Sequence, residues 1–406
     1  VVDGWLLVNG AAAAGALGLG CVPLWLTARL KRRLPALRAA GDAAPWCPPA
    51  SLVLPCKGID PGFDDNLLAL LGQDYPGLEK LFVVATADDP AYGAIAGMLA
   101  RRPDLAGSAR LIVAGVAPGR AQKLTNQLAA LREASPRSEV LVFVDSDCRP
   151  DPGFVRRLVA PLAADEVGAT TGYRWYHPPR ADLGSMLRST WNAGALPFLV
   201  DDRTTHAWGG AMAIRRQVFE RAGIERAWDN AVSDDMTLTV AVHRLGLRLQ
   251  FVPQCIAVSH EASTLAQTLE FTNRQSLISR IYLPPLWWGT ALGHGVVNLL
   301  AGYGLYGALA WAVGGAPAML AAAACLLIVP MQMANAAWMF GSVRGMLPPA
   351  LRRPADALRW RYMLCAPLAS VMCLVNTVHA ASTRRLTWRG ITYELRSPVE
   401  TVVVGR

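Results

Sequence analysis

Long apolar segments separate the charged parts of this chain and predict where it meets a membrane. The stretch from Ile281 to Val343 contains no Asp, Glu, Lys or Arg. It is long enough for two spans of about 20 residues each, and the sequence GGAP at 314–317 predicts a turn between them. Tyr362–Ala381 and Trp5–Ala28 are further segments of spanning length. The pattern therefore predicts a membrane protein with one apolar segment near its start and about three toward its end.

We expect the first apolar segment to be a membrane anchor at residues 1–30 rather than a cleaved signal peptide. A signal peptide places its positive charge before a shorter apolar core, whereas Arg29 and Lys31 follow a long core here. The positive-inside rule then places the next domain in the cytoplasm. The later segments predict a C-terminal membrane region at 285–383, and a basic tail follows at 384–406.

The region between the membrane segments, residues 46–284, alternates short apolar runs with helical patterns. The runs read SLVLP, KLFVVAT, ARLIVAG and EVLVFVD, and residues 121–134 predict an amphipathic helix. Alternating strands and helices are typical of a mostly parallel sheet with helices on both faces. The sequence thus predicts an α/β domain at 46–284, combined with transmembrane helices.

The composition agrees with a chain that is partly embedded in a membrane. Hydrophobic residues make up 53% and charged residues 17%, and the mean hydropathy is +0.27. The net charge of +9 does not indicate nucleic-acid binding, because no module with Lys or Arg interleaved with aromatic residues is visible. Juxtamembrane arginines that face anionic lipid head groups explain this charge better. The eight cysteines form no CxxC pair, which argues against structural zinc and a disulfide framework.

Pairs of aspartates follow two of the predicted strands, at the edge of the sheet where ligands bind in such folds. Asp145 and Asp147 lie two residues apart on an extended segment, so both can hold a hard cation that also contacts a diphosphate. Many such pairs are instead solvated turn residues. Asp88 and Asp89 precede Pro90, which suits either a plain turn or a carboxylate that binds ribose or base hydroxyls.

A third pair, Asp234 and Asp235, begins a segment with a helical pattern. Ser233 or Asp234 is placed to cap this helix, which leaves one aspartate free to act as a base. Arg274 is either an interfacial arginine or a clamp for a phosphate leaving group, and Lys123 has the same two interpretations.

Eight segments of the predicted α/β domain and the tail carry a family resemblance. They read LPCKGIDPGFDDNL, LGQDYPGLEKLFVV, ADDPA, QKLTN, VDSDCRPDP, WGGAMAIRR, SDDMTLTVAV and TWRGITYEL. Together they resemble the ceramide glucosyltransferase family and cover nearly the whole predicted cytoplasmic domain. The resemblance implies a nucleotide-sugar glycosyltransferase with the A-type (GT-A) fold.

The resemblance also implies roles for individual residues. Asp89 resembles the first family aspartate, which contacts the UDP-sugar donor. Asp145 resembles the second, and Asp147 completes a pair that binds a divalent cation, Mg²⁺ or Mn²⁺. Asp235 resembles the third, the catalytic base, and Lys123 is expected on the donor side.

Arg274 occupies the arginine of the family motif (Q/R)XXRW, which is expected to contact the donor. Phe271 stands where the motif has Gln or Arg, and Gln275 replaces its tryptophan. An alignment on Arg280 fits no better, since it places Ile281 at the tryptophan. That tryptophan supports the acceptor sugar in processive polysaccharide synthases. Its absence weakens a polymerase interpretation and leaves the acceptor open.

The resemblance implies an inverting transfer of a sugar, expected to be glucose, from a UDP-sugar to a lipid hydroxyl such as that of ceramide. The loop Trp208-Gly209-Gly210 is predicted to let the acceptor approach closely, because glycine has no side chain. The enzyme is expected in the bacterial inner membrane as a multi-pass protein, with its catalytic domain on the cytoplasmic face. A hopanoid or diacylglycerol acceptor with UDP-N-acetylglucosamine, a non-catalytic scaffold and a transporter are the alternatives.

The predicted topology contains a conflict. With its N-terminus outside and four spans, the chain would place its tail outside. That tail carries Arg384, Arg385, Arg389 and Arg396, which the positive-inside rule keeps in the cytoplasm. One apolar segment would then be re-entrant or interfacial.

Overall fold

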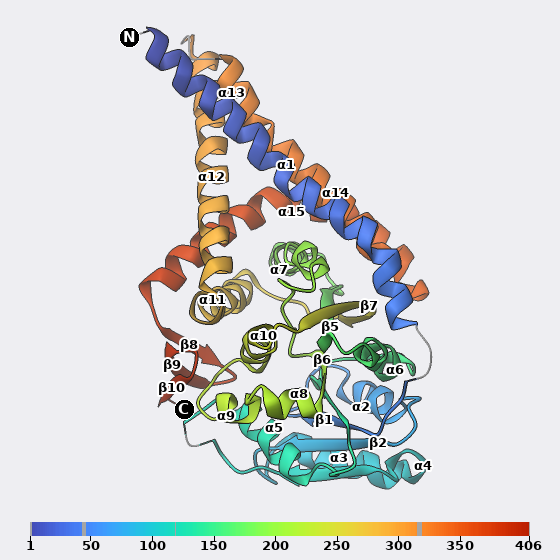
Figure 1. Ribbon diagram of the computed structural model, residues 1–406. Coiled ribbons are helices and arrows are strands. Elements are labelled where there is room, and N and C mark those ends of the chain that lie inside the picture. Colours follow the sequence, from blue (N-terminus) through green and yellow to red (C-terminus); the bar gives the residue numbers. More distant parts are fainter. Residues whose placement is uncertain (1, 43–45, 118, 315–318, 406) are drawn as a thin grey trace. The chain divides into compact units, whose positions relative to one another are not determined.

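A computed structural model describes residues 2–42, 46–117, 119–314 and 319–405 of the chain (Figure 1). The turn predicted at 314–317 lies outside the described residues from Gly315 onward.

The chain folds into two compact units. The α/β unit comprises Arg33–His177, Phe198–Glu261 and Arg384–Arg406, and the helical unit comprises Val1–Arg32, Pro178–Pro197 and Ala262–Thr383. The C-terminal tail therefore belongs to the α/β unit. Two parts of the predicted 46–284 domain, 178–197 and 262–284, group with the helices instead.

A seven-stranded sheet in the order β3-β2-β1-β4-β6-β5-β7 forms the α/β unit's centre. Its strands are β1 (Ala50–Pro55), β2 (Leu78–Val84), β3 (Ala109–Val113), β4 (Val140–Val144), β5 (Val167–Tyr176), β6 (Ala211–Arg215) and β7 (Arg248–Ser259). β1 pairs in parallel with β2 and β4, β2 with β3, and β5 with β7. Only β6 is antiparallel to its described neighbours, so the mostly parallel sheet predicted from the sequence is confirmed.

Helices connect the strands of the α/β unit. They are α2 (Phe63–Leu71), α3 (Pro90–Arg101), α4 (Pro103–Ala106), α5 (Gln122–Glu133), α6 (Phe154–Val159), α8 (Arg216–Arg221), α9 (Ile224–Trp228) and α10 (Asp234–Arg244), with a 3-10 turn at Ala160–Ala163 after α6 and another at Leu196–Val200. α5 confirms the amphipathic helix predicted at 121–134.

Apolar side chains alternate between the two faces of the sheet, as they do along any strand. Leu52 and Leu54 of β1 belong to one buried cluster together with Phe63 of α2. Phe143 of β4 points the other way and meets Trp228 of α9 edge to face, with ring centroids 5.2 Å apart. Both faces of the sheet are therefore covered by helices, which leaves its carboxyl edge for a ligand site.

The C-terminal tail folds as a small antiparallel sheet with the order β10-β9-β8. Its strands are β8 (Arg385–Trp388), β9 (Ile391–Ser397) and β10 (Glu400–Gly405). Tyr393 and Leu395 of the central strand are buried, so the sheet has an apolar side.

The helical unit contains the long apolar segments. Its helices are α1 (Val2–Gly41), whose last turns belong to the α/β unit, α7 (Leu183–Ala193), α11 (Leu265–Tyr282), α12 (Pro284–Ala312), α13 (Met319–Leu326), α14 (Ile328–Arg344) and α15 (Pro349–Ser382). Four stretches of the described residues are long and apolar enough to cross a membrane: Leu7–Gly41, Pro284–Ala312, Leu320–Arg344 and Pro349–Ser382.

Polar side chains within these apolar helices are paired with one another. Thr27 of α1 donates to Asn335 of α14 at 2.8 Å, and the His294 ring nitrogen of α12 lies 2.9 Å from the Ser370 hydroxyl of α15. A polar group in apolar surroundings is costly without a partner, so these contacts satisfy the polar groups of both pairs.

Candidate active site

The D-x-D segment follows β4 at the carboxyl edge of the sheet. The Asp145 backbone amide donates to the Gly210 carbonyl at 3.3 Å, which continues the β4–β6 pairing past the end of β4. The side chains of Asp145 and Asp147 are 26% and 15% exposed. Both carboxylates are therefore mostly buried and keep a small exposed surface.

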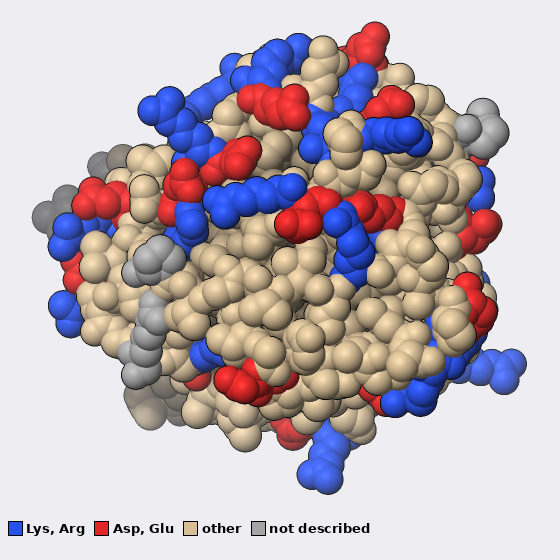
Figure 2. Space-filling model, turned by 90° about the horizontal axis from the view of Figure 1, so that it is seen from below, with Lys and Arg blue, Asp and Glu red and all other residues tan. Residues whose placement is uncertain are grey.

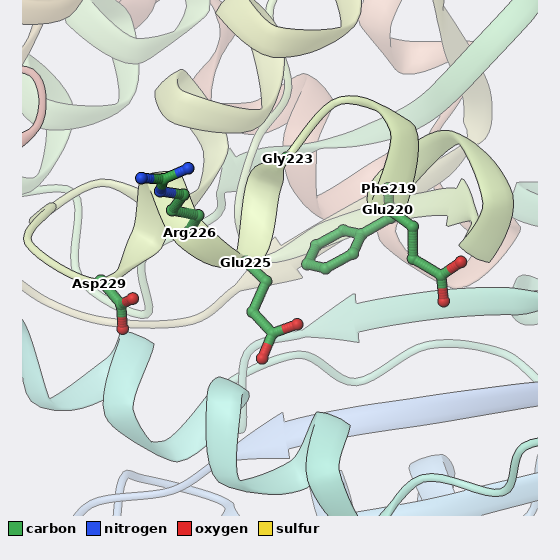
Figure 3. Close-up of a pocket in the computed structure, with 6 residues that line it drawn as sticks. All are labelled: Phe219, Glu220, Gly223, Glu225, Arg226 and Asp229. Atoms are coloured by element: carbon green, nitrogen blue, oxygen red, sulfur yellow. The ribbon is translucent and has the colours of Figure 1, made fainter.

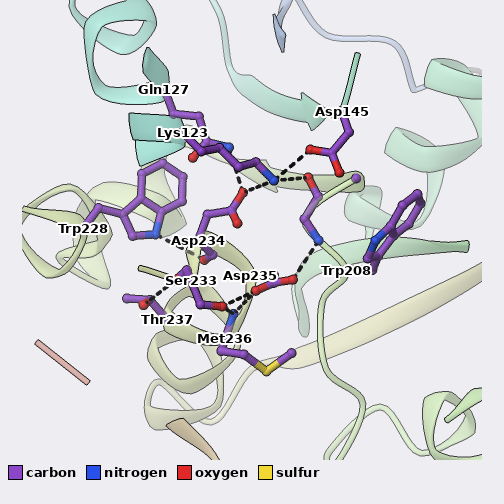
Figure 4. A network of polar contacts seen from close by, with 12 residues as sticks. Lys123, Gln127, Asp145, Trp208, Trp228, Ser233, Asp234, Asp235, Met236 and Thr237 are labelled. Carbon is purple, nitrogen blue, oxygen red and sulfur yellow. Dashed lines mark hydrogen bonds and ion pairs between the residues drawn. The ribbon is translucent and has the colours of Figure 1, made fainter. Parts of the chain in front are cut away.

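Lys123, in the first turn of α5, joins two of the aspartate segments (Figure 4). Its ammonium nitrogen lies 2.8 Å from Asp145 Oδ1 and 3.0 Å from Asp234 Oδ2, and it donates to the Gly209 carbonyl at 3.1 Å. Burial lowers the pKa of Lys123, but Asp145 and Asp234 outweigh it and hold the pKa above its usual range. The lysine is therefore a cation that binds the D-x-D segment to the start of α10.

Arg174 of β5 is a second buried cation, and the sequence analysis did not identify it. Its guanidinium lies 2.7 Å from Asp147 Oδ1 and 3.3 Å from Asp145 Oδ2, and its Cζ lies 5.0 Å from the centre of the Trp208 ring. The sequence did hold one signal, since Arg174 is the one charged residue in the strand VGATTGYRWY. A lone charge in a fully buried strand requires a partner.

The pKa of Asp147 is raised. Burial is the largest cause, Arg174 opposes it, and the nearby carboxylates of Asp145 and Glu261 add to it. Acidic side chains thus gather at this edge of the sheet beside Arg174.

The two aspartates in the first turn of α10 have different surroundings. Ser233 is the N-cap, and its hydroxyl accepts from the Met236 amide at 3.2 Å. Asp234 is buried and accepts from Gln127 at 2.8 Å. Burial raises the pKa of Asp234 to about 6, although Lys123 acts against this shift.

Asp235 is half-buried and points toward the glycine loop (Figure 4). One carboxylate oxygen accepts from the Gly209 amide at 3.0 Å. The other accepts from the Met236 amide at 2.8 Å and from the Ser233 hydroxyl. These donors fix the direction of the carboxylate, which the positioning of a general base requires.

The loop Trp208-Gly209-Gly210 lies inside this network. A Cβ on Gly209 would meet Asp234 Oδ1 at 2.8 Å and Lys123 Nζ at 2.9 Å, and one on Gly210 would meet the Trp208 ring at 2.0 Å. The glycines are thus needed for the close packing of the loop on the ion pairs. Their role in admitting an acceptor stays a prediction.

Asp89 is the N-cap of α3, and Asp88 beside it is exposed. Asp89 Oδ1 accepts from the Ala91 amide at 2.9 Å and from the Gly58 amide at 2.8 Å. The second bond ties the loop after β1 to the loop after β2. Asp89 therefore holds two neighbouring loops of the carboxyl edge together, and its predicted contact with the donor remains a prediction.

Arg274 lies on α11 in the helical unit. Its guanidinium carbon is 5.5 Å from the centre of the Phe271 ring, and that of Arg188 is 4.5 Å from the same ring. Phe271, which replaces the first residue of the motif, thus supports two arginines. The donor contact predicted for Arg274 stays a prediction.

Arg280, the alternative arginine, has a structural partner. It donates to the carbonyl of Ala380, and to that of Thr383 at 3.1 Å, at the end of α15. A cation at this position satisfies carbonyls that a helix end leaves unpaired.

The molecular surface adds two observations. Figure 2 shows one face on which acidic and basic side chains are interspersed, without a continuous basic stripe among the described residues there. A hollow beside α8 and α9 is lined by Phe219, Glu220, Gly223, Glu225, Arg226 and Asp229 (Figure 3). No residue predicted for the site lines this hollow, so the carboxylate cluster is a separate feature.

The mostly parallel sheet, with the D-x-D segment at its carboxyl edge beside the aspartates of α10, fits a glycosyltransferase of the A-type (GT-A) fold. The chain belongs to glycosyl transferase family 21, whose family model matches residues 11–400. The predicted membership of the ceramide glucosyltransferase family is thereby confirmed, and the protein is a glycosyltransferase.

Several solved structures are similar to part of the chain. Glucosyl-3-phosphoglycerate synthase from Mycobacterium tuberculosis, in complex with Mn²⁺ and UDP-glucose, is 17% identical over 60% of this chain and 81% of that chain, with a TM-score of 0.36. Its complex with phosphoglyceric acid has the same identity and TM-score over 82% of that chain. A mycobacterial protein is 20% identical over 60% of this chain and 76% of that one, with a TM-score of 0.36.

Proposed function

We propose that this glycosyltransferase is a membrane-bound, inverting enzyme. It transfers a sugar, which we propose is glucose, from a UDP-sugar to the hydroxyl of a lipid such as ceramide. The observation that carries the proposal is the contact of Lys123 with both Asp145 and Asp234. It brings the predicted donor-binding segment and the segment of the predicted base to one edge of the sheet.

The proposal includes a divalent cation, Mg²⁺ or Mn²⁺, held by Asp145 and Asp147. The two carboxylates converge on one guanidinium, so they can also converge on a metal ion. Among the described residues no three His, Cys, Asp or Glu side chains gather as a complete metal site. In general, Mg²⁺ is held by one or two carboxylates, and substrate phosphates and water complete its coordination shell. When bound, the cation supplies positive charge for the departing diphosphate.

Asp235 is the proposed general base. The lipid hydroxyl oxygen attacks C1 of the donor sugar from the side opposite UDP, and its proton moves to Asp235. The new C1–O bond forms as the bond from C1 to the diphosphate breaks, and UDP leaves with the electron pair. Lys123 keeps the D-x-D segment and α10 together during this step, and Arg274 is proposed to contact the diphosphate.

The lipid acceptor is supported by the helical unit. Four stretches of the described residues have the length and apolarity of membrane spans. Trp287 and Trp288 lie side by side at the start of α12, with ring centroids 4.8 Å apart, and tryptophans favour the head-group level of a bilayer. We propose the bacterial inner membrane as the location, with the catalytic domain on the cytoplasmic face.

The test replaces the proposed base by Asp235→Asn in the full chain. Because an amide cannot take the acceptor proton, transfer of sugar from UDP-glucose to ceramide in membranes should fall by about 10²- to 10⁴-fold. The melting temperature should fall only moderately, since the asparagine oxygen replaces one of the two oxygens that accept from the Gly209 and Met236 amides, and its NH2 group faces the other donor. Asp104→Asn, an exposed carboxylate outside the site, is the matched control. Near-normal turnover by Asp235→Asn would contradict the assignment of Asp235 as the general base.

A panel of donors and acceptors distinguishes the alternatives in the same assay. If product forms only with a hopanoid or diacylglycerol, or only from UDP-N-acetylglucosamine, the protein is still a glycosyltransferase but its proposed substrate is wrong. Release of no UDP with any lipid extract would contradict catalysis and favour a scaffold.

A further inference from the structure

The turn between β8 and β9 contacts the loop that follows β1. Lys57 Nζ donates to the Arg389 carbonyl at 2.7 Å, and Arg389 donates to the Lys57 carbonyl at 3.0 Å. The Arg389 guanidinium also lies 3.2 Å and 3.1 Å from the two oxygens of Asp60. The guanidinium thus uses Nη2 for both oxygens of Asp60 and Nη1 for the Lys57 carbonyl, so two groups of the same loop fix its position. The tail is thus fastened to the carboxyl edge of the sheet within the α/β unit.

Arg389 occupies a backbone conformation that does not suit it. Trp388 pairs with Ile391, so Arg389 and Gly390 form a two-residue hairpin loop, with φ angles of 47° and 81°. Such a turn favours Asn or Gly at its first position, because a Cβ is strained at positive φ. Among the described residues, Arg389 is the one non-glycine residue with a positive φ. Because this backbone conformation disfavours arginine, the reason for an arginine here lies in the contacts of its side chain.

The loop held by Arg389 is also held by a predicted donor-binding residue. The Gly58 amide, next to Lys57, donates to Asp89 Oδ1 at 2.8 Å. Asp89 caps α3 at the same time. The loop between β1 and α2 therefore lies between Asp89 on one side and the tail on the other.

The charge of Arg389 acts on the D-x-D segment as well. Burial lowers its pKa, but Asp60 outweighs burial, and Asp147 and Asp145 add to the rise. Its guanidinium is thus a positive charge near the place where a diphosphate is proposed to bind, and its side chain remains 44% exposed.

We propose that the C-terminal hairpin completes the UDP-binding part of the active site, with Arg389 as a positioning residue. Arg389 holds the loop of Lys57 to Asp60 in place beside Asp89 and contributes positive charge that favours a bound diphosphate. This inference rests on the proposed function, because it takes UDP as the leaving group.

Arg389→Asn in the full-length protein separates this role from a structural one. Asn suits the positive φ of the turn, so the melting temperature should be unchanged or higher. The Kd of UDP, measured by calorimetry with Mn²⁺ in detergent, should rise about tenfold, because the loop of Lys57 to Asp60 loses its contact with the tail and the site loses a positive charge. KM for the UDP-sugar should rise similarly, whereas kcat should change less. Arg389→Lys, which keeps the charge without the planar contact to Asp60, should give an intermediate Kd.

Two further variants make the test specific. Arg385→Asn removes an exposed arginine that pairs with Glu394 in the same small sheet, and it should leave the Kd of UDP unchanged. Asp60→Asn should weaken UDP binding, and its combination with Arg389→Asn should add little, because the two side chains act as one pair.

The outcomes distinguish this inference from the proposed function. If the wild type binds no UDP and transfers no sugar, the proposed function fails first. If the wild type binds UDP and Arg389→Asn binds it equally well, the role of Arg389 is overturned while the function stands. Equal losses in Arg389→Asn and Arg385→Asn would also overturn it, since the small sheet would then matter only for folding.

Discussion

Lys123 is the residue on which the site depends most directly. One ammonium faces carboxylates from two segments that are far apart in the chain, and it is itself largely buried. Removing one member of a buried ion pair leaves an uncompensated charge and costs far more than the pair contributes. The cluster therefore holds its geometry only when all of its members are present.

Asp234 makes the stability of the protein depend on pH. Its pKa in the folded protein is raised from 3.8 to about 6, so between these values the folded state binds more protons than the unfolded state. Stability then falls as pH rises through this window, and the full penalty, on the order of 3 kcal/mol, is present above it. On acidification from pH 7 to 4.5, the wild type should gain melting temperature relative to Asp234→Asn.

Parallel melting curves of the two proteins in one detergent check this prediction. Because the prediction concerns the difference between them, the titration of other groups largely cancels. A difference that stays constant with pH would show that Asp234 is not the titrating group.

At the scale of elements, the start of α10 places the proposed base. Ser233 caps the helix and also donates to Asp235, so one hydroxyl serves both folding and the direction of the carboxylate. Helix α10 and strand β4 then meet through Lys123. The geometry of the site is thus set by a helix cap and a strand end.

Ser233→Ala removes both contacts of this hydroxyl. Loss of an N-cap costs about 1 kcal/mol of stability, and Asp235 loses one of its hydrogen-bond donors. We expect a lower melting temperature and a kcat that falls more than KM rises. Ser233→Thr retains a hydroxyl at the cap and should restore both. A kcat unchanged in Ser233→Ala would contradict the proposed positioning of Asp235.

At the scale of the whole molecule, the tail decides a question of topology. Residues 384–406 fold with the α/β unit, so we expect both to lie on one side of a bilayer. Three candidate spans separate Glu261 from Arg384 in the chain, and an odd number of crossings would place them on opposite sides. We therefore expect that one of these three stretches does not complete a crossing.

We expect α15 to be that stretch. It contains Pro354 and Pro367 within the helix, and Asn376 donates to Thr272 and Asn273 of α11 at 2.9 Å and 2.7 Å. α11 is too polar to lie in lipid, as its sequence LAQTLEFTNRQSLISRIY shows. A helix that packs on such a neighbour fits the membrane surface better than the hydrocarbon core.

Protease cleavage in oriented vesicles tests this topology. A cleavage site at the C-terminus and one in the loop after α5 should be cut from the same side. Cleavage of the loop with protection of the tail would contradict the folding of the tail with the α/β unit, and would support three complete crossings.

Much of the fold follows from local patterns in the sequence. Strands β1 to β4, helix α5 and the apolar spans each carry their own periodicity or length, which depends on neighbouring residues only. The D-x-D segment could be assigned to the carboxyl edge for the same reason, since it directly follows the buried run VLVFV. Family membership was likewise readable from segments of the chain alone.

Only the tertiary structure decided how these parts act together. The order of the strands brings Arg174 to the D-x-D pair, and Lys123 to Asp234, although no pattern along the chain links them. Arg389 is separated from Asp60 by nearly the whole chain and meets it only after folding. Periodicity reports which side of an element is buried, whereas the pairing of charges depends on which elements become neighbours. The sequence alone therefore indicated the class of protein and its candidate aspartates. The fold then showed which cations contact these aspartates.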